Sequence, residues 1–393
     1  MIRTSGCLQP EVLFCKADAM SVPLEKLQQI PASIASVSDY EAAARPRLTE
    51  GAFAYLAGGA EDEVTLQANR AAFREISLRT RVLQDLTGGN RQLNLFGSTF
   101  ASPILLAPVA YQKLFHPDGE VGTAIAASAT GTGMIVSTQA SVALEAVAEQ
   151  CTAPKWFQLY IQPDRPFTER LIRRAEDAGY TALVITVDAP VSGMRNREQR
   201  AGFCLPPGIE AVNLEGMSAL PPQSMQIGGQ LLLGSRLLAA APTWRDIAWL
   251  KSITSLPIVL KGIMTSDDAI LALESGADGI VVSNHGGRVL DTQPATMHVL
   301  PEIVAAIRKQ IPILLDGGIR RGSDVFKALA LGADAVLIGR AYAYGLAAAG
   351  MTGVAHVIQI LLAELESVMA LTGCITLDSI SQRNIAAPRS SSE

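Results

Sequence analysis

Short apolar runs rich in β-branched residues recur eight times along the chain, and each is followed by a stretch with the hydrophobic period of a helix. Near-continuous apolar strands that alternate with helices are typical of parallel strands buried on both faces. Eight such units within about 240 residues predict an α/β fold, a single (β/α)8 TIM barrel, rather than an open sheet. The runs begin at Pro103, Gly133, Trp156, Ala182, Pro257, Gly279, Pro312 and Ala335.

The pattern before the first run predicts an extension followed by helices. Pro10, Pro23 and Pro31 interrupt any helical period in residues 1–37, which we expect to be partly disordered. Ordered structure should begin at Ser38 and Asp39, either of which can cap an Ala-rich helix, and a second helical run ends at the glycine pair 58–59. We therefore expect an extension over residues 1–37, one barrel domain over residues 38–385 and a tail over residues 386–393.

The spacing between runs is regular except after the fourth strand. About 70 residues separate the fourth and fifth strands, and they include a stretch rich in Pro, Gly and Ser at residues 205–234. A segment of this length inside a compact domain is either an active-site lid or a disordered loop. Of these two alternatives we favour the first, a lid that covers the active site.

Charge and cysteine content narrow the class of partner. A net charge of -5 with scattered Lys and Arg argues against a nucleic-acid partner, because such binding needs clustered positive charge. Five cysteines without a close pair suit reduced thiols in the cytosol, and we expect no structural metal. Charged residues interrupt the first 20 positions, so we expect neither a signal peptide nor a membrane span.

Polar residues end almost every predicted strand. In barrels of this kind the active site forms at the C-terminal ends of the strands, and a purely structural barrel has no need of polar groups at nearly all of them. We therefore expect the site to be built from these ends. In chain order they are Ala110, Ser137 and Thr138, Gln158 and Tyr160, Thr186 and Asp188, Lys261, Ser283 to His285, Asp316 to Gly318, and Gly339 with Arg340.

Two glycine-rich motifs follow strands seven and eight. DGGIRRG occupies residues 316–322 and LIGR occupies residues 337–340. Glycines let backbone N–H groups approach an anion closely, and arginines and helix N-termini add positive potential. The motifs predict a phosphate site, although glycine turns that merely close two strand–helix units would look alike. Many unrelated barrels bind phosphate here, so the motifs identify no reaction.

Lys261 and His285 are the candidate reactive groups. A buried ammonium at the end of strand five requires an anionic partner, so Lys261 could stabilise charge on a cofactor, form a Schiff base, or simply emerge into solvent. His285 lies in SNHGGR, residues 283–288, where Arg288 can hold a carboxylate while the imidazole acts as a base. Asp188 can orient that imidazole. We interpret His116, His298 and His356, which lack such neighbours, as structural or exposed.

From about residue 40 to residue 385 the chain resembles the FMN-dependent 2-hydroxy acid oxidase and dehydrogenase family, and especially its glycolate and lactate oxidases. The resemblance is carried by YLAGGAEDEVTLQANR, APVAYQKLFHPDGE, WFQLYI, TVDAP, VLKG, SNHGGR and DGGIRRGSDVFKALALGADAVLIGR. It implies oxidation of a small L-2-hydroxy acid, L-lactate or glycolate, to the 2-oxo acid with FMN. Dioxygen then reoxidises the flavin and gives hydrogen peroxide.

The resemblance also implies roles for individual residues. It makes His285 the base, with Asp188, Tyr160, Arg288 and Lys261 completing the catalytic group. Substrate would be bound by Tyr55, Tyr160, Arg195, His285 and Arg288. The FMN contacts would be Pro108, Val109, Ala110, Ser137, Gln158, Thr186, Lys261, Ser283, Asp316, Gly317, Gly318, Arg320, Gly339 and Arg340. A homo-oligomer, either a tetramer or an octamer, is also implied.

Three departures from glycolate oxidase concern the size of the substrate. Gln139 stands in place of a tryptophan over the substrate, Tyr111 replaces a smaller or more flexible residue, and Ser192 lies where a larger side chain is common. We expect both lactate and glycolate to react, with lactate preferred. The chain ends in SSE rather than a peroxisomal tripeptide, from which we expect a cytoplasmic location.

Other functions remain open at this stage. An L-2-hydroxy acid dehydrogenase would pass electrons to a quinone or another acceptor, but members of that type carry glycine where this chain has Ala110. A lactate monooxygenase would carry a longer loop insertion. An FMN or phosphosugar barrel that acts as an isomerase, or a catalytically silent binding protein, has no need of a carboxylate clamp beside a base. Such a clamp is offered here by Tyr55, Tyr160, Asp188, His285 and Arg288.

Overall fold

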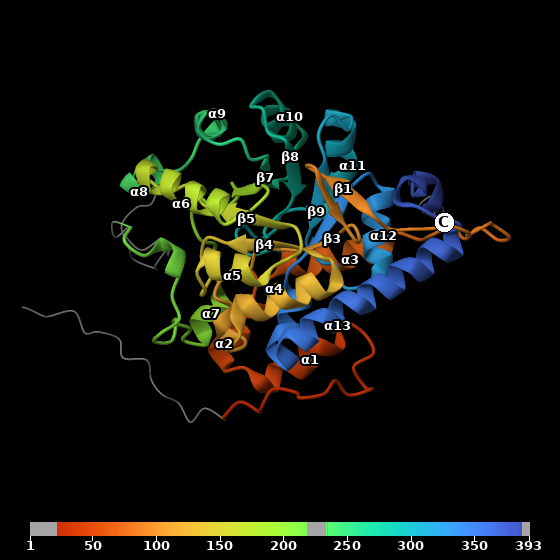
Figure 1. Ribbon diagram of the computed structural model, residues 1–393, viewed down its shortest axis with the longest axis horizontal. Coiled ribbons are helices and arrows are strands. Elements are labelled where there is room, and N and C mark those ends of the chain that lie inside the picture. Colours follow the sequence, from red (N-terminus) through yellow and green to blue (C-terminus); the bar gives the residue numbers. More distant parts are fainter. Residues whose placement is uncertain (1–21, 218–232, 234, 387–393) are drawn as a thin grey trace, which may run out of the picture.

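A computed structural model describes residues 22–217, 233 and 235–386 of the chain. Eight parallel strands close into a barrel in the order β10-β3-β4-β5-β6-β7-β8-β9 (Figure 1). All eight apolar runs form these strands, so the predicted (β/α)8 barrel is confirmed. The strands are β3 (Ile104–Leu106), β4 (Gly133–Ser137), β5 (Lys155–Leu159), β6 (Leu183–Thr186), β7 (Ile258–Ile263), β8 (Gly279–Val282), β9 (Ile313–Asp316) and β10 (Ala335–Ile338).

The register of the strands brings their polar ends together. Ser137 of β4 pairs with Gln158 of β5, and Thr186 of β6 pairs with Lys261 of β7. On the next part of the rim, Asp316 of β9 pairs with Leu337 of β10. Because parallel strands place their carboxyl ends at one edge, residues far apart in the sequence meet at a single rim of the barrel.

Helices cover the outside of the barrel. Their apolar faces pack on the strands to form the larger core, while a second apolar cluster fills the barrel interior around Trp156. The helices that follow the strands are α4 (Gly119–Thr130), α5 (Leu144–Gln150), α6 (Arg165–Asp177), α9 (Trp244–Ile253), α10 (Ser266–Glu274), α11 (Thr296–Ile307), α12 (Gly322–Ala330) and α13 (Arg340–Thr372).

A short hairpin closes the end of the barrel opposite the polar rim. It consists of β1 (Leu93–Leu95) and β2 (Ser98–Phe100), and the rings of Phe96 and Phe100 lie 5.5 and 5.8 Å from that of Trp156. Phe100 also packs on Gly133, the first residue of β4. The barrel is therefore open to a ligand at the polar rim and filled with apolar side chains below it.

Among the described residues, three α-helices precede the barrel: α1 (Asp39–Ala44), α2 (Glu50–Ala57) and α3 (Val64–Glu75). The predicted end of the second helical run is confirmed, since α2 stops at Gly58. The expected side-chain cap of α1 is not formed, because Ser38 makes no capping hydrogen bond and Asp39 instead accepts one from the backbone N–H of Ser36 at 2.8 Å. The start of the helix is thus fixed by the preceding turn.

The described part of the predicted extension, residues 22–37, has no regular helix or strand but is bonded to the barrel domain. Lys26 donates to the carbonyl oxygens of Arg47 and Phe115, and the Leu27 N–H donates to Ala348. Residues 1–21 and 387–393 lie outside the described residues, as do residues 218–232 and 234 of the predicted lid. The described remainder of that segment includes α7 (Asn196–Arg200) and α8 (Arg236–Ala239).

One described helix, α13, is long and apolar enough to cross a membrane by length and composition alone. It packs against α1, α4 and α12, and Figure 1 shows it running beside α4. Ala349 and Gly350 depart from helical backbone angles within it, and 56% of its most apolar window is buried. Packing on the barrel therefore accounts for its apolar composition.

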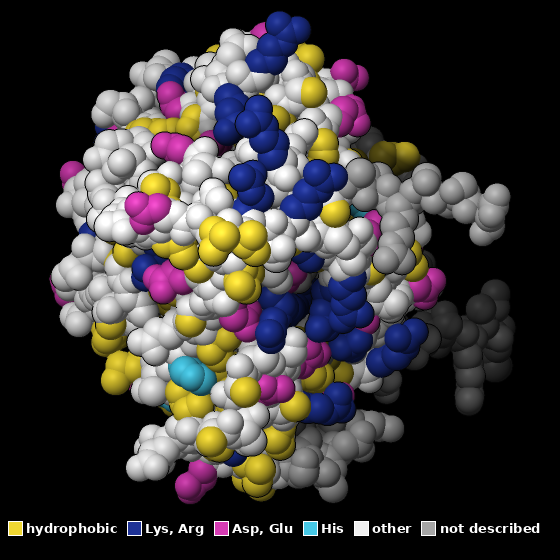
Figure 2. All heavy atoms as spheres, turned by 90° about the vertical axis from the view of Figure 1, so that its right-hand side faces the viewer, with side chains coloured by type: hydrophobic (Ala, Val, Ile, Leu, Met, Phe, Trp, Pro, Cys, Tyr) yellow, Lys and Arg dark blue, Asp and Glu magenta, His cyan; other side chains and the backbone are white. Residues whose placement is uncertain are grey.

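The surface on the right of Figure 1 carries Lys and Arg side chains in several groups, with hydrophobic and acidic side chains between them (Figure 2). The C-terminal end of α13 lies on this side (Figure 1). There Arg321 pairs with Glu364 at 3.1 Å, and Arg91 pairs with Glu366. Neighbouring carboxylates thus neutralise part of the positive charge on this face.

Candidate active site

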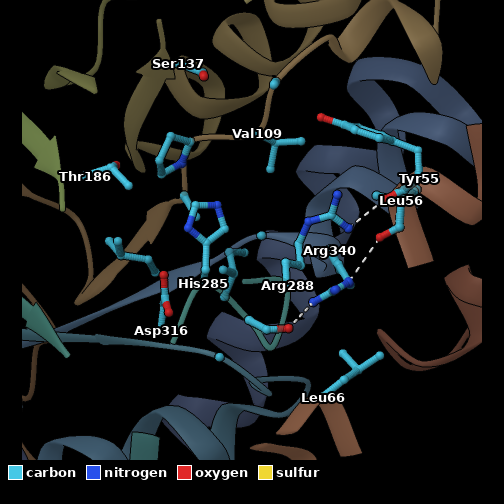
Figure 3. A pocket seen from close by; sticks show the side chains of 18 of the residues that line it. Tyr55, Leu56, Leu66, Val109, Ser137, Thr186, His285, Arg288, Asp316 and Arg340 are labelled. Atoms are coloured by element: carbon cyan, nitrogen blue, oxygen red, sulfur yellow. Dashed lines mark hydrogen bonds between the residues drawn. The ribbon is translucent and has the colours of Figure 1, made fainter. Parts of the chain in front are cut away.

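A cavity of about 790 Å³ opens at the polar rim of the barrel. It is lined by all the site residues predicted from the sequence except Asp188 and Ser283, which lie directly behind the lining. Figure 3 shows the His285 ring and the Arg288 guanidinium projecting into it, with Tyr55 beyond Arg288. Residues from α2, every barrel strand end and the segment after β6 therefore meet around one space.

His285 is held by Asp188. The Nδ1 atom lies 2.8 Å from Oδ1 of Asp188, and Ser283 Oγ accepts a hydrogen bond from the backbone N–H of His285. Burial raises the pKa of Asp188, but the charges of His285 and Lys261 together lower it by more than burial raises it. The pKa of Asp188 is therefore below its ordinary value. An ionised Asp188 fixes the proton on Nδ1 and leaves Nε2 as the acceptor available to the cavity.

The loop that carries His285 is fixed by a pair of buried amides. Asn69 of α3 and Asn284 exchange two hydrogen bonds of 2.8 and 2.9 Å, and Asn284 Oδ1 also accepts from the Gly287 N–H. His285 itself has a left-handed φ of 57°, which costs energy for a residue with a side chain and needs such support. Sequence reasoning did not find Asn69; its only signal was a polar residue within a helical run.

Lys261 is inside the protein rather than in solvent, with 4% of its surface exposed. Its Nζ lies 3.1 Å from Oδ2 of Asp316 and donates to Ser283 Oγ at 2.9 Å. Burial lowers the pKa of Lys261, but Asp316 and Asp188 raise it more, so the net pKa is above the ordinary value. A protonated ammonium cannot attack a carbonyl, so the raised pKa and the contact with Asp316 favour charge stabilisation over a Schiff base.

Two arginines form one wall of the cavity. Arg288 Nη1 donates to the carbonyl oxygens of Tyr55 and Gly58 at 2.7 and 2.8 Å, and its guanidinium lies 5.1 Å from the Tyr55 ring centroid. Arg288 and Arg195 both contact Oε1 of Glu198, at 3.2 and 3.3 Å. Sequence reasoning did not find Glu198, for which the spacing of three residues from Arg195 was the available signal.

The three residues expected to set substrate size all line the cavity. The Tyr111 N–H donates to the Gln139 carbonyl at 3.1 Å, and the Tyr111 ring centroid lies 6.3 Å from that of Tyr55. Phe203, which sequence reasoning also missed, stacks on Tyr55 at 5.0 Å. The substrate end of the cavity is therefore more aromatic than the sequence suggested, and Ser192 adds no bulk to it.

The glycine motifs and their arginines form the opposite end. Gly317 and Gly318 have φ angles of 96° and 86°, and a Cβ on Gly318 would meet the Asn69 carbonyl oxygen at 2.1 Å, so only glycine fits there. Arg340 donates to three carbonyl oxygens, among them that of Gly286 at 2.9 Å. Burial and Arg288 lower the pKa of Arg340 to about 9, a cost that an anion nearby would relieve.

Besides Nε of Arg195, two buried polar atoms in the lining have no hydrogen-bond partner within the described residues. They are Nε2 of Gln158, a donor, and Oδ1 of Asp316, an acceptor. Leaving such groups unpaired is unfavourable, and a flavin carbonyl and a ribityl hydroxyl have the chemistry to pair with them. Together with the glycine and arginine end, these atoms fit FMN. No group of three or more potential metal ligands occurs among residues 22–217, 233 and 235–386.

Comparison with known proteins agrees with this geometry. A profile of the FMN-dependent dehydrogenase family matches residues 44–387. The chain belongs to this family. The predicted family and cofactor are thereby confirmed.

Several proteins similar to this chain are named as oxidases. The chain is 49% identical over 347 residues to an L-lactate oxidase of a Nostoc species, covering 87% of this chain and 95% of that protein. It is 45% identical over 354 residues to glycolate oxidase of Spinacia oleracea, covering 90% and 96%. A solved structure of mandelate oxidase with (S)-2-phenylpropionate is 42% identical with a TM-score of 0.81, covering 90% and 98%.

Proposed function

We propose that this FMN-dependent enzyme oxidises a small L-2-hydroxy acid, L-lactate or glycolate, to the 2-oxo acid, with dioxygen as the final electron acceptor. One observation carries the proposal. His285, which Asp188 holds in place, lines the same cavity as the guanidinium groups of Arg195 and Arg288 and the polar groups that fit FMN. A base beside a carboxylate clamp suits removal of a proton from a bound hydroxy acid.

Each side chain has a distinct task in this reaction. Arg195 and Arg288 bind the substrate carboxylate and orient the α-carbon. Burial and the charge of Asp188 raise the pKa of Tyr160, so its phenol stays protonated as a hydrogen-bond donor. His285 Nε2 takes the substrate proton, and Asp188 stabilises the imidazolium that results.

The cofactor and Lys261 complete the chemistry. When bound, FMN supplies the acceptor for the two electrons that leave the substrate. Ser137, Gln158 and Thr186 would hold the flavin ring, and the glycine motifs with Arg320 and Arg340 would hold the phosphate. Lys261 keeps a positive charge on a side chain that is itself buried, and electrostatic stabilisation is strong where water has little access.

The names of the relatives support an oxidase over a dehydrogenase that uses a quinone. Measuring oxygen uptake and hydrogen peroxide with L-lactate tests this directly. An oxidase forms one peroxide per 2-oxo acid and gains little from an added artificial acceptor. A protein that turns over with a quinone but not with oxygen would instead be a dehydrogenase.

The Arg288→Lys variant should bind substrate more weakly because a lysine cannot reproduce the guanidinium fork. Losing one charge-assisted hydrogen bond weakens binding by roughly 10- to 100-fold. We expect this in the KM for L-lactate, while Arg173→Lys, whose parent side chain is 61% exposed, should not change it. An unchanged KM in Arg288→Lys would remove Arg288 from the carboxylate clamp.

The Gln139→Trp variant should shift the efficiency ratio from lactate towards glycolate. The indole would fill volume that the lactate methyl group uses, and one methylene or methyl is worth about 1–3 kcal/mol in an apolar pocket. The ratio of kcat/KM values for the two acids measures the effect. If the ratio stays the same, Gln139 does not face the substrate side chain and the preference for lactate loses its support.

We also propose that the chain forms a homo-oligomer, a tetramer or an octamer, and works in the cytoplasm. Val82, Leu83 and Leu371 expose large apolar side chains on adjoining segments, which supports association. Light scattering should give four or eight times the mass of 41.5 kDa, and cell fractionation should place the protein with cytosolic markers. A monomer, or recovery with an organelle, would contradict the respective proposal.

A further inference from the structure

Three charged side chains share one wall of the substrate cavity. Oε1 of Glu198 lies 3.3 Å from Nη1 of Arg195 and 3.2 Å from Nη2 of Arg288. Their side chains are 14%, 22% and 15% exposed, so solvent screens them only partly. One carboxylate between two guanidinium groups leaves a net charge of +1 on this wall.

The other charged groups of the cavity are paired or lie towards the glycine-motif end. Lys261 is neutralised by Asp316, and Asp188 is engaged with His285. Arg340, whose charge repels that of Arg288, donates to backbone carbonyl oxygens at the glycine-motif end, where Arg70 and Arg320 also line the cavity. The charge of the wall that faces a substrate carboxylate is therefore set mainly by Arg195, Arg288 and Glu198.

The geometry also limits what remains for a ligand. Arg288 uses Nη1 for the carbonyl oxygens of Tyr55 and Gly58, and its Nη2 touches Glu198. Arg195 keeps a buried Nε without a partner among the described residues. Donors are thus left for a substrate carboxylate, whereas a second carboxylate in the same cavity would add to the negative charges of Glu198 and Asp188.

We propose that Glu198 is a specificity-determining residue that restricts this site to monocarboxylates. It cancels one of the two arginine charges, so a monoanion neutralises the wall while a dianion leaves an excess negative charge in a poorly screened cavity. The inference rests on the proposed function, since it assumes that Arg195 and Arg288 face the substrate carboxylate. Like-charge juxtaposition of this kind selects against the wrong ligand.

A rival role for Glu198 makes a different prediction. If Glu198 only holds the two arginines in place, its removal should weaken all anions by the same factor. If it sets the charge of the wall, its removal should favour dianions over monoanions. The ratio of two dissociation constants therefore separates the roles, and general loss of affinity cancels from it.

Propionate and malonate are suitable probes, because they have similar size and differ by one carboxylate. We would titrate each into the FMN-loaded protein by calorimetry and calculate the malonate-to-propionate ratio of Kd values. Wild type should bind propionate more tightly. In Glu198→Gln the ratio should fall by about tenfold or more, because the repulsion between Glu198 and the second carboxylate is removed. A tenfold change corresponds to about 1.4 kcal/mol of interaction free energy. Glu198→Asp, which keeps the charge, should stay near wild type.

Glu210→Gln is the matched control, because it removes an exposed carboxylate from the same segment. Its ratio should equal that of wild type. An unchanged ratio in Glu198→Gln, or an equal fall in Glu198→Asp, would overturn the inference. Anaerobic bleaching of wild-type flavin by L-lactate keeps the two proposals apart: without bleaching the proposed function fails, and with bleaching but no change in ratio only the role of Glu198 fails.

Discussion

Replacing His285 with alanine is expected to leave FMN bound and to slow flavin reduction by L-lactate by roughly 10²–10⁴-fold, the usual contribution of a general base. The base is defined by its contact with Asp188 at 2.8 Å, which leaves Nε2 for the substrate. Truncation removes that acceptor but none of the groups that match the flavin. Anaerobic stopped-flow measurement of flavin absorbance gives the rate directly.

A second histidine provides the control for this variant. His298 is 48% exposed and contacts Glu75 on the surface, so His298→Ala should reduce its flavin at the wild-type rate. Both variants should retain stoichiometric FMN. Reduction of His285→Ala within a few-fold of wild type would show that another group takes the proton.

Lys261→Met is expected to destabilise the protein by about 3–5 kcal/mol, because breaking a buried ion pair strands the remaining charge. Lys261 and Asp316 are 5% and 10% exposed, and Oδ1 of Asp316 already lacks a partner within the described residues. Methionine would leave this carboxylate without its counter-charge among the lining residues that fit FMN. We therefore expect weaker FMN retention as well, measured by urea unfolding and by flavin content after dialysis.

Lys251→Met is the matched comparison. Lys251 pairs with Asp278 at 2.8 Å, but the two side chains are 36% and 35% exposed, and exposed pairs contribute only about 0–1 kcal/mol. This variant should unfold within that margin of wild type and keep its FMN. Equal losses in Lys251→Met and Lys261→Met would contradict a special role for the buried pair.

The barrel and most of its rim could be predicted from sequence because both depend on local pattern. A strand buried on both faces must be almost wholly apolar, so a polar residue at its end is conspicuous. Thr186 and Lys261 stood out in this way, and the register places them side by side. The resemblance then attached roles to positions that the pattern had already marked.

Residues that act through tertiary contacts could not be found in this way. Asn69 lies on a helix that precedes the barrel, and it matters only because folding brings it to Asn284. Glu198 looks like any acidic residue of a polar segment until Arg195 and Arg288 both contact it. The predicted cap of α1 was wrong for a similar reason, because the Asp39 carboxylate accepts a hydrogen bond from the preceding turn rather than from its own helix.

The central claim is that this cavity holds FMN and delivers to it electrons from an L-2-hydroxy acid. Anaerobic titration of the purified, FMN-loaded protein with L-lactate and then, separately, with D-lactate tests it most directly. We expect one FMN per chain and loss of the flavin absorbance with L-lactate alone. A protein that cannot be loaded with FMN, or a bound flavin that no L-2-hydroxy acid bleaches, would contradict it.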